Sequence, residues 1–344
     1  MTEPVAINAR AAARREIGGV ERLAREMAML LPALNPDRYR VIKPRPALAH
    51  RAGHVWEQAA LPLLSRGSKL VYSPANLAPL ACGSRNVVVI HDVAALRHPE
   101  WYRPAYVAYQ RALLPRIAAK ARLVITVSEF SKNELIDVLK LDAAKIAVVP
   151  NGVDRRFNPS ADQQAARAAH KLERPYVLVV GTRIARKNVN ALTSAARRLD
   201  KAGVELIHAG SGRHYMRAEA GGALRELGYV QEEHLPGLYA GALALAMPSL
   251  YEGFGLPCLE AMACGTPVVA ADRAALPETT GGAALLVDPD DDAAFTDALE
   301  QLVADSSYRH ELAMRSVERA HPFTWLRTAQ LTDAAIEDAL QPAR

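Results

Sequence analysis

The sequence predicts an α/β protein made of two doubly wound domains. Short, continuously apolar runs such as residues 87–90 and 176–180 alternate with longer amphipathic or polar stretches along the chain. Runs of this kind are typical of parallel strands buried on both faces, and their alternation with helical stretches indicates parallel sheets. The length of 344 residues allows two domains of ordinary size.

The composition excludes several classes of protein. Half of the residues are hydrophobic, which supports a large core, and no apolar run reaches the roughly 18 residues that span a bilayer. The N-terminus lacks the basic-then-apolar pattern of a signal peptide. Three cysteines without Cys-x-x-Cys spacing indicate a reducing compartment and no structural zinc, and we expect Cys258 and Cys264 to be small buried residues. A cytoplasmic protein is expected, with peripheral contact at the inner face of the membrane left open.

Charge is distributed unevenly. Residues 1–160 contain 24 Lys and Arg against 13 Asp and Glu, whereas the remainder contains 18 against 24. Such asymmetry predicts an anionic partner for the first half, and nucleic acid, anionic lipid and a lipid-diphosphate acceptor are candidates beside a merely solvated basic face. No nucleic-acid module is present in the sequence. Residues 101–122 mix tyrosines with basic residues, which suits a membrane surface, although a core-facing helix with a basic outer face is favoured.

Residues 248–260 (PSLYEGFGLPCLE) carry the strongest pattern. They follow an apolar strand at 243–247 and lead into a helix that opens at Pro257. Gly253 and Gly255 let the backbone approach a ligand closely, and free amides at the helix start favour an anion. Glu252 and Glu260 would be repelled by a diphosphate, so we expect them to accept hydrogen bonds from sugar hydroxyls. Spacing alone favours an ordinary strand–turn–helix unit in which one glutamate stabilises the helix dipole.

The whole string resembles the Glu-x7-Glu signature of retaining GT-B glycosyltransferases of the GT4 type (glycosyltransferase group 1), a family that includes bacterial mannosyltransferases of surface polysaccharide synthesis. The resemblance extends from Gly18 to about Leu340. It implies that Glu260 holds the donor ribose and that Glu252 lies by the donor sugar and phosphates. The nucleotide-sugar site would include the loop residues between them: Gly253, Phe254, Gly255 and Leu256.

In the first domain, a strand is expected at 5–8, and Gly18-Gly19 precede a helix at 21–31. The resemblance places this glycine pair against the donor phosphates and acceptor. His91 directly follows a buried strand at 86–90, at the sheet edge where ligands bind in α/β folds. The resemblance assigns His91 to the donor sugar.

In the second domain, the strand at 176–180 is followed by Arg183, Arg186 and Lys187. Positive charge there would neutralise a departing diphosphate, although a basic surface loop is the ordinary alternative. The resemblance implies Lys187 and one arginine, Arg183 or Arg186, on the diphosphate, and backbone near Val230, after a short strand at 227–230, on the nucleobase. The Asp-x-Asp at 288–292 is interpreted as a helix cap, not a metal site.

We therefore expect a GT-B fold: residues 1–160 form an acceptor-binding Rossmann-like domain, residues 161–318 a nucleotide-sugar-binding one facing it across a cleft, and residues 319–344 a helix that crosses back to the first domain. The expected activity is that of a retaining, metal-independent hexosyltransferase that needs no cofactor. Its catalytic residues would be His91, Lys187 and Glu252. The expected donor is GDP-mannose, with UDP- and dTDP-sugars open, and the expected acceptor is lipid-linked or an oligosaccharide. The alternatives are a GT-B sugar-nucleotide epimerase and a non-catalytic basic membrane or nucleic-acid binder.

Overall fold

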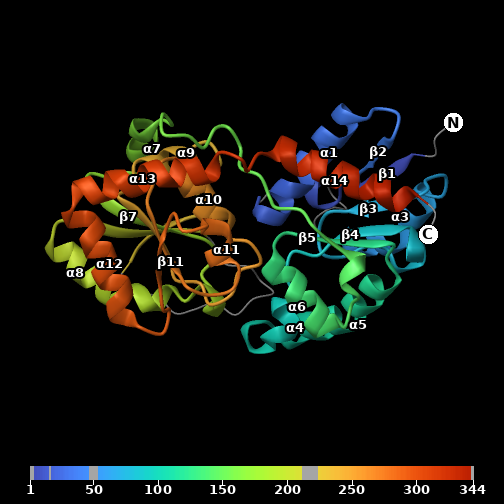
Figure 1. The fold of residues 1–344 in the computed structure, drawn as a ribbon, viewed down its shortest axis with the longest axis horizontal. Helices are drawn as coiled ribbons and strands as arrows, with labels where there is room; N and C mark the ends of the chain where they lie inside the picture. Colours follow the sequence, from blue (N-terminus) through green and yellow to red (C-terminus); the bar gives the residue numbers. More distant parts are fainter. Residues whose placement is uncertain (1–3, 15–16, 46–52, 211–223, 342–344) are drawn as a thin grey trace. The chain divides into compact units, whose positions relative to one another are not determined.

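The computed structural model describes residues 4–14, 17–45, 53–210 and 224–341 and divides into two compact units (Figure 1). Unit 1 comprises residues 1–97, 104–152 and 325–344, and unit 2 comprises residues 98–103 and 153–324. Each unit contains its own six-stranded sheet in which every pair of neighbouring strands is parallel. The sequence pattern of two doubly wound sheets is therefore present in the structure.

The sheet of unit 1 has the strand order β2-β1-β3-β4-β5-β6. Its strands are β1 (Val5–Asn8), β2 (Tyr39–Ile42), β3 (Val71–Ser73), β4 (Asn86–Val89), β5 (Leu123–Thr126) and β6 (Ile146–Val148). The central strands β1, β3 and β4 are buried along their whole length, as their mainly apolar sequences predict.

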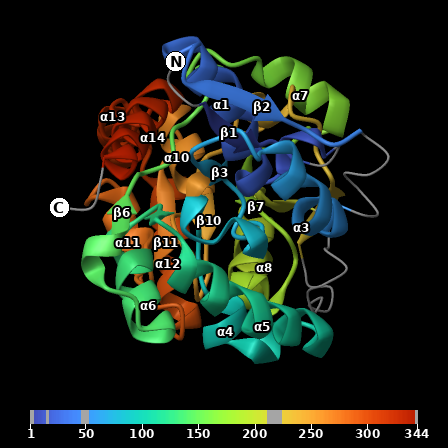
Figure 2. The ribbon, with the colours of Figure 1, turned by 90° about the vertical axis from the view of Figure 1, so that its right-hand side faces the viewer.

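Helices cover both faces of this sheet. They are α1 (Gly19–Leu34), α3 (Gly53–Leu64), α4 (Ala94–Arg97), α5 (Pro104–Lys120), α6 (Glu129–Leu139) and α14 (Trp325–Leu340). The helix α1 packs on β2 and α14, whereas α5 packs on β4, and α6 on β5 and β6. Figure 2 shows α4 and α5 together below the strands of this sheet.

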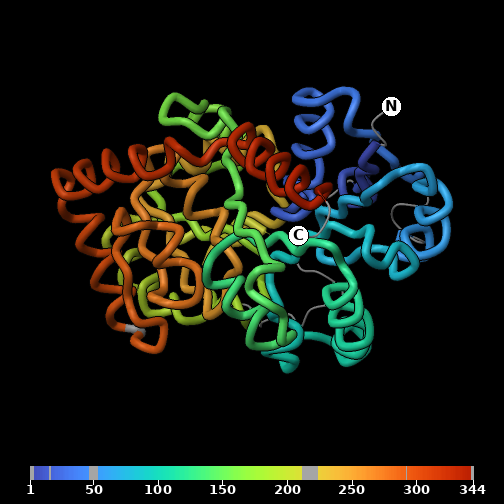
Figure 3. Tube along the Cα trace, turned by 45° about the vertical axis from the view of Figure 1, so that its right-hand side comes forward, coloured from blue at the N-terminus to red at the C-terminus, as the bar shows by residue number. Residues whose placement is uncertain are grey.

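The last helix, α14, belongs to unit 1, and Figure 3 traces the red end of the chain back beside the blue first helix. Asp333 of α14 accepts hydrogen bonds from Asn35, Arg38 and Tyr39 at 2.6–2.7 Å. The expected return of the C-terminal helix to the first domain is thus present.

The sheet of unit 2 has the order β12-β11-β10-β7-β8-β9. Its strands are β7 (Tyr176–Val180), β8 (Glu205–Ala209), β9 (Arg225–Gly228), β10 (Ala244–Met247), β11 (Val268–Ala271) and β12 (Leu285–Val287). The helices are α7 (Gln163–His170), α8 (Thr193–Lys201), α9 (Leu235–Ala240), α10 (Leu256–Ala263), α11 (Leu276–Thr280), α12 (Asp292–Ala304) and α13 (Ser306–Ala320). In Figure 1, α8 and α12 lie on one side of this sheet and α7, α9 and α10 on the other.

The compact units do not end where the sequence analysis divided the chain. Residues 153–160 lie in unit 2, because Val153 pairs with Thr324 and the Phe157 ring lies 5.8 Å from that of Tyr239. Residues 319–324 also belong to unit 2, since α13 runs to Ala320 and packs on α10. The short segment 98–103 joins unit 2 as well, with the His98 ring 5.6 Å from Tyr251.

Three elements differ from what the sequence predicted. Two of them, β2 and α3, were not predicted at all and lie in the basic region before residue 70. The third, the edge strand β9, covers Arg225–Gly228 instead of 227–230, because Arg225 is anchored to Glu205 of the neighbouring strand at 3.0 Å.

Across the described ranges, no helix combines the length and apolar character needed to span a bilayer.

Candidate active site

The predicted loop after β10 has the geometry that its glycines suggested. Gly255 adopts φ 96° and caps α10, and a Cβ at this position would lie 2.7 Å from Leu276. Pro257 stands in the first turn of the helix, as expected. The loop residues from Glu252 to Leu256 are buried, so the first amides of α10 start from a tightly held backbone.

Glu252 brings together two of the predicted basic residues. Its Oε1 lies 2.6 Å from Lys187 Nζ and 3.0 Å from Arg186 Nη1, and Arg186 also donates to the carbonyl of Tyr251 at 2.8 Å. Glu252 and Lys187 are 7% and 8% exposed. The loops after β7 and β10 thus build one cluster of two cations and a carboxylate, in which only Arg186 is partly exposed. We call it the Glu252 cluster (Arg186, Lys187 and Glu252).

The charges in this cluster shift one another's titration. Burial alone would raise the pKa of Glu252, but Arg186 and Lys187 outweigh it and lower the pKa to about 2. Burial lowers the pKa of Lys187, and Arg186 adds to this effect although Glu252 opposes it. Glu252 is therefore an anion at neutral pH, and the cluster carries a net positive charge when both cations are protonated.

The two candidate arginines have different neighbours. Arg186 lies in the Glu252 cluster, whereas Arg183 forms a close ion pair with Glu226 of β9 and approaches Asn190 at 3.4 Å. The structure therefore groups Arg186, and not Arg183, with Lys187. Asn188, which follows Lys187, has the left-handed φ of 51° that turns the chain out of this loop.

Glu260 is buried in α10, and its Oε2 accepts a hydrogen bond from the Tyr239 hydroxyl at 2.9 Å. Tyr239 comes from α9, is fully buried, and its own carbonyl accepts from Thr266 Oγ1 at 2.6 Å. The sequence analysis gave Tyr239 no role. A buried tyrosine needs a hydrogen-bond partner for its hydroxyl, so the sequence could have indicated that Tyr239 makes such a bond. Which residue accepts the bond depends on the packing of α9 on α10.

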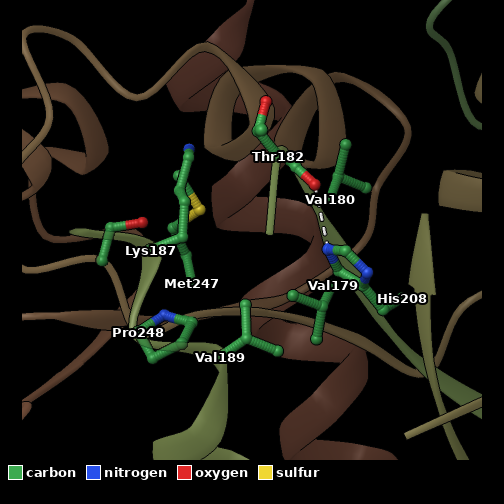
Figure 4. Close-up of a pocket in the computed structure, with 10 residues that line it drawn as sticks. Val179, Val180, Thr182, Lys187, Val189, His208, Met247 and Pro248 are labelled. Atoms are coloured by element: carbon green, nitrogen blue, oxygen red, sulfur yellow. Dashed lines mark hydrogen bonds between the residues drawn. The ribbon is translucent and has the colours of Figure 1, made fainter. Parts of the chain in front are cut away.

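His208 is a second residue to which sequence reasoning gave no role. It is the penultimate residue of β8, and its Nε2 is 2.9 Å from the Gly181 carbonyl and its Nδ1 is 2.7 Å from Glu226. Figure 4 shows it at a small pocket at the carboxyl ends of β7, β8 and β10, also lined by Thr182, Lys187 and Met247. Burial lowers the pKa of His208.

The remaining predicted residues are positioned by local contacts. Val230 is buried just beyond β9. In unit 1, Gly18 precedes α1, and its amide donates to Glu21 Oε2 at 3.1 Å, while Gly19 is the first residue of that helix.

His91 follows β4 in unit 1, and its ring is fixed by the strand next to it. Its Nε2 lies 3.0 Å from the Pro74 carbonyl, which can only accept, so Nε2 carries the proton. Its amide donates to Asn76 Oδ1 at 2.8 Å, and its carbonyl accepts from Ser131 Oγ at 3.0 Å. Burial lowers the pKa of His91, which leaves a neutral ring with an acceptor at Nδ1.

The aspartates after β12 act as caps. Asp291 Oδ1 accepts from the amides of Ala293 and Ala294 at the start of α12, and Asp288 Oδ1 accepts from the amide of Asp290. In the part of the chain that the structure describes, no three His, Cys, Asp or Glu side chains are grouped so that they could hold a metal ion.

Comparison with known families assigns both halves of the chain. Residues 174–305 match the model described as "Glycosyl transferases group 1", and residues 69–157 match "Glycosyltransferase Family 4". The O-antigen chain mannosyltransferase B of Escherichia coli is 34% identical over 255 residues, which cover 70% of this chain and 67% of that protein. The chain belongs to the group 1, family 4 glycosyltransferases.

Other relatives of this glycosyltransferase are named for different activities. A D-inositol 3-phosphate glycosyltransferase of Kribbella flavida is 34% identical over 65% of this chain and 58% of its own length. The MMP alpha-(1->4)-mannosyltransferase of Mycolicibacterium hassiacum is 30% identical over 72% of this chain and 62% of its own length. The match thus spans about three fifths to two thirds of these relatives.

Solved structures support the fold. Sucrose-phosphate synthase from Thermosynechococcus elongatus superposes with a TM-score of 0.75 at 20% identity over 98% of both chains. Anabaena Alr3699/HepE in complex with UDP-glucose gives 0.73 at 19% identity, over 97% of this chain and 99% of that one. WaaG, a glycosyltransferase involved in lipopolysaccharide biosynthesis, gives 0.70 at 14%, over 96% and 99%. The predicted GT-B fold is confirmed.

Proposed function

We propose that this glycosyltransferase transfers mannose from GDP-mannose, with retention at the anomeric carbon, to a glycan or lipid-linked acceptor of bacterial surface polysaccharide. The observation that carries the proposal is the Glu252 cluster, where the buried Lys187 and the largely covered Arg186 hold Glu252 at 2.6 and 3.0 Å in the loops after β7 and β10. Mannose is favoured because the relative that matches over 70% of the chain is an O-antigen chain mannosyltransferase.

In this proposal the donor diphosphate lies against Arg186 and Lys187. Negative charge grows on the phosphate oxygen as its bond to the sugar breaks, and fixed cations stabilise that charge more in the transition state than in the bound donor. Glu252 accepts hydrogen bonds from the mannose hydroxyls, a role that suits a carboxylate with a pKa of about 2. Glu260, oriented by Tyr239, accepts from the ribose hydroxyls.

The proposed substitution occurs on one face of the sugar. The bond from the anomeric carbon to the phosphate oxygen breaks, the bond to the acceptor oxygen forms on the same face, and the departing phosphate takes the acceptor proton. The products are GDP and an α-mannoside. The two cations and helix amides supply the positive charge of the site, so we propose that neither a metal ion nor a cofactor is required.

A thermal-shift panel of nucleotide diphosphates and sugar nucleotides tests this proposal first. GDP and GDP-mannose should raise the melting temperature more than UDP, dTDP and their sugars, because a ligand that binds only the folded state stabilises it by mass action. NMR of the product formed from GDP-mannose then reports the anomeric configuration. A protein indifferent to every sugar nucleotide, or a β-configured product, would contradict the proposal.

A second acceptor class has support of its own. Relatives named as D-inositol 3-phosphate glycosyltransferases match 65–66% of the chain at 31–34% identity, and the excess of basic residues before residue 160 suits an anionic acceptor. Release of GDP or UDP in the presence of inositol 3-phosphate, compared with a mannoside, separates the two acceptors. Donor conversion without any acceptor would instead indicate an epimerase.

A further inference from the structure

Unit 1 contains a buried polar cluster at the carboxyl edge of its sheet. Asn8 ends β1 and Ser73 ends β3, and the Asn8 amide nitrogen lies 3.2 Å from Ser73 Oγ. Side chains alternate along strands, so Asn8 and Ser73 share the sheet face of Ala6 and Val71. That face is covered by α3, whose Trp56 and Leu61 pack on Ala6 and Val71.

Glu57 of α3 completes this cluster, and its carboxylate is fully buried. Its Oε1 accepts from Asn8 Nδ2 at 2.6 Å and lies 3.2 Å from the Nε of Arg10, which is 4% exposed. Burial would raise the pKa of Glu57, but His54, Arg10 and Asn8 outweigh it and lower the pKa. A buried ion pair rarely stabilises a fold better than apolar residues of the same size would, so this one calls for a functional explanation.

Above the carboxylate lies a half-exposed imidazole. The His54 side chain is 47% exposed, and its Nδ1 lies 3.5 Å from Glu57 Oε2. That oxygen makes no hydrogen bond of good geometry within the described ranges. The His54 ring meets the half-buried Tyr109 of α5 edge to face, with centroids 5.5 Å apart. An imidazole of α3 and an aromatic ring of α5 thus meet at the surface, directly over the buried carboxylate of Glu57.

This combination matches the chemistry of a sugar ring. The apolar face of a pyranose packs on an aromatic ring, while its hydroxyls both donate to carboxylates and exchange hydrogen bonds with imidazole nitrogens. A few polar groups held in place beside an aromatic surface are typical of small-molecule sites. Because Arg10 already compensates the charge of Glu57, this point has no spare buried cation in the described part of the chain to attract a phosphate, and an uncharged sugar is the fitting ligand.

The cluster is also connected to His91. Ser73 precedes Pro74, whose carbonyl receives the His91 Nε2 proton at 3.0 Å. A continuous path therefore runs from Glu57 through Asn8 and Ser73 to the residue that the family resemblance assigns to the donor sugar.

We propose that His54 and Tyr109, braced from below by Glu57, bind the terminal sugar ring of the acceptor. The proposal rests on the proposed function, because it presumes a sugar-bearing acceptor. His54 contacts the sugar directly, and Glu57 acts as a positioning residue that fixes the imidazole.

The test compares His54→Ala and His54→Gln with the control Val55→Ala, an exposed neighbour on the same helix. Transfer from GDP-mannose is measured to octyl glycosides of mannose, glucose, galactose and N-acetylglucosamine. In His54→Ala we expect the KM for the best octyl glycoside to rise about tenfold, the effect of one lost hydrogen bond to a ligand. In His54→Gln the KM should rise less than in His54→Ala, and in Val55→Ala the KM should equal that of the unaltered protein.

Two further measurements keep the outcomes distinct. Calorimetry should give the same affinity for GDP-mannose in all variants, since the proposal assigns His54 to the acceptor sugar and not to the donor. Saturation-transfer NMR with the octyl glycosides, without donor, should lose its signal in His54→Ala and keep it in Val55→Ala. Unchanged KM and NMR signal in His54→Ala, or no octyl glycoside accepted by a protein that binds GDP-mannose, would overturn the acceptor site alone. Absence of any sugar-nucleotide binding would overturn the proposed function with it.

Discussion

Replacing Lys187 with methionine tests the proposed role of the Glu252 cluster. Methionine keeps an unbranched side chain of similar length and adapts to irregular packing, so the change removes the charge and little else. Lys187 is 8% exposed and its Nζ lies 2.6 Å from Glu252. Glu252 keeps Arg186 at 3.0 Å, so the buried carboxylate is not left without a cation.

The magnitude follows from the burial of the charge. Two unit charges about 4 Å apart interact by roughly 4 kcal/mol at the effective dielectric of a protein, and loss of one fixed donor to a developing anion costs about 2.7–4 kcal/mol in the transition state. We therefore expect kcat to fall about 10²–10³-fold. The affinity for GDP-mannose should fall less than about tenfold, because the charge on the leaving oxygen is not yet fully developed.

The assay is single-turnover transfer at saturating GDP-mannose, with calorimetric titration of GDP-mannose and GDP. Lys201→Met, an exposed lysine at the end of α8, is the matched control and should change neither quantity. Because free GDP carries the full charge, its affinity should drop more than that of GDP-mannose. Equal losses of kcat and donor affinity, or an unaltered kcat, would refute the assignment of Lys187 to the leaving phosphate.

Three further predictions concern unit 2. Tyr239→Phe removes the hydrogen bond to Glu260 and should weaken GDP-mannose binding by about 1–3 kcal/mol; calorimetric affinity equal to that of the unaltered protein would remove Glu260 from the ribose site. Glu252 has its folded pKa lowered to about 2, so its contribution to stability is present above the usual value near about 4.3 and is lost as the pH falls towards 2. The free energy of unfolding in urea should accordingly be lower for Glu252→Gln than for the unaltered protein at pH 7. The difference between the two free energies should narrow below about pH 4, and a difference that stays constant with pH contradicts this. Turnover should survive EDTA dialysis and should not respond to added Mg²⁺, and abolished transfer would show that the cations do not suffice.

The sequence predicted which residues of the candidate site lie together where those residues are close in the chain or follow strand ends. The string from Glu252 to Glu260 and the basic residues after β7 were found because short loops at strand ends must meet at one edge of a parallel sheet. The choice between Arg183 and Arg186 was not predictable, since it depends on β9 bringing Glu226 to Arg183 across the sheet. The bond from Tyr239 to Glu260 likewise joins two helices through packing alone.

The strands were predictable where their sequences are apolar, and the prediction failed where basic residues hide the pattern. Mainly apolar strands such as β1 and β7 were placed to the residue, whereas β2 and α3 were missed in a region dominated by Arg and Lys. Pro62 inside α3 further obscured its helical period. The assignment of residues 98–103 to unit 2 rests on the rings of His98 and Trp101 against Tyr251, a contact across about 150 positions that no local pattern specifies.

The anchoring of α14 by Asn35, Arg38 and Tyr39 has a consequence for biogenesis. When the ribosome has finished residue 152, the sheet that starts the protein still lacks the helix that covers α1, and residues 153–324 must be made before that helix emerges. When residue 324 has been made, unit 2 has all of its residues and can fold, whereas unit 1 still lacks α14. Truncation before Trp325 would therefore destabilise unit 1, although most of that unit is synthesised first.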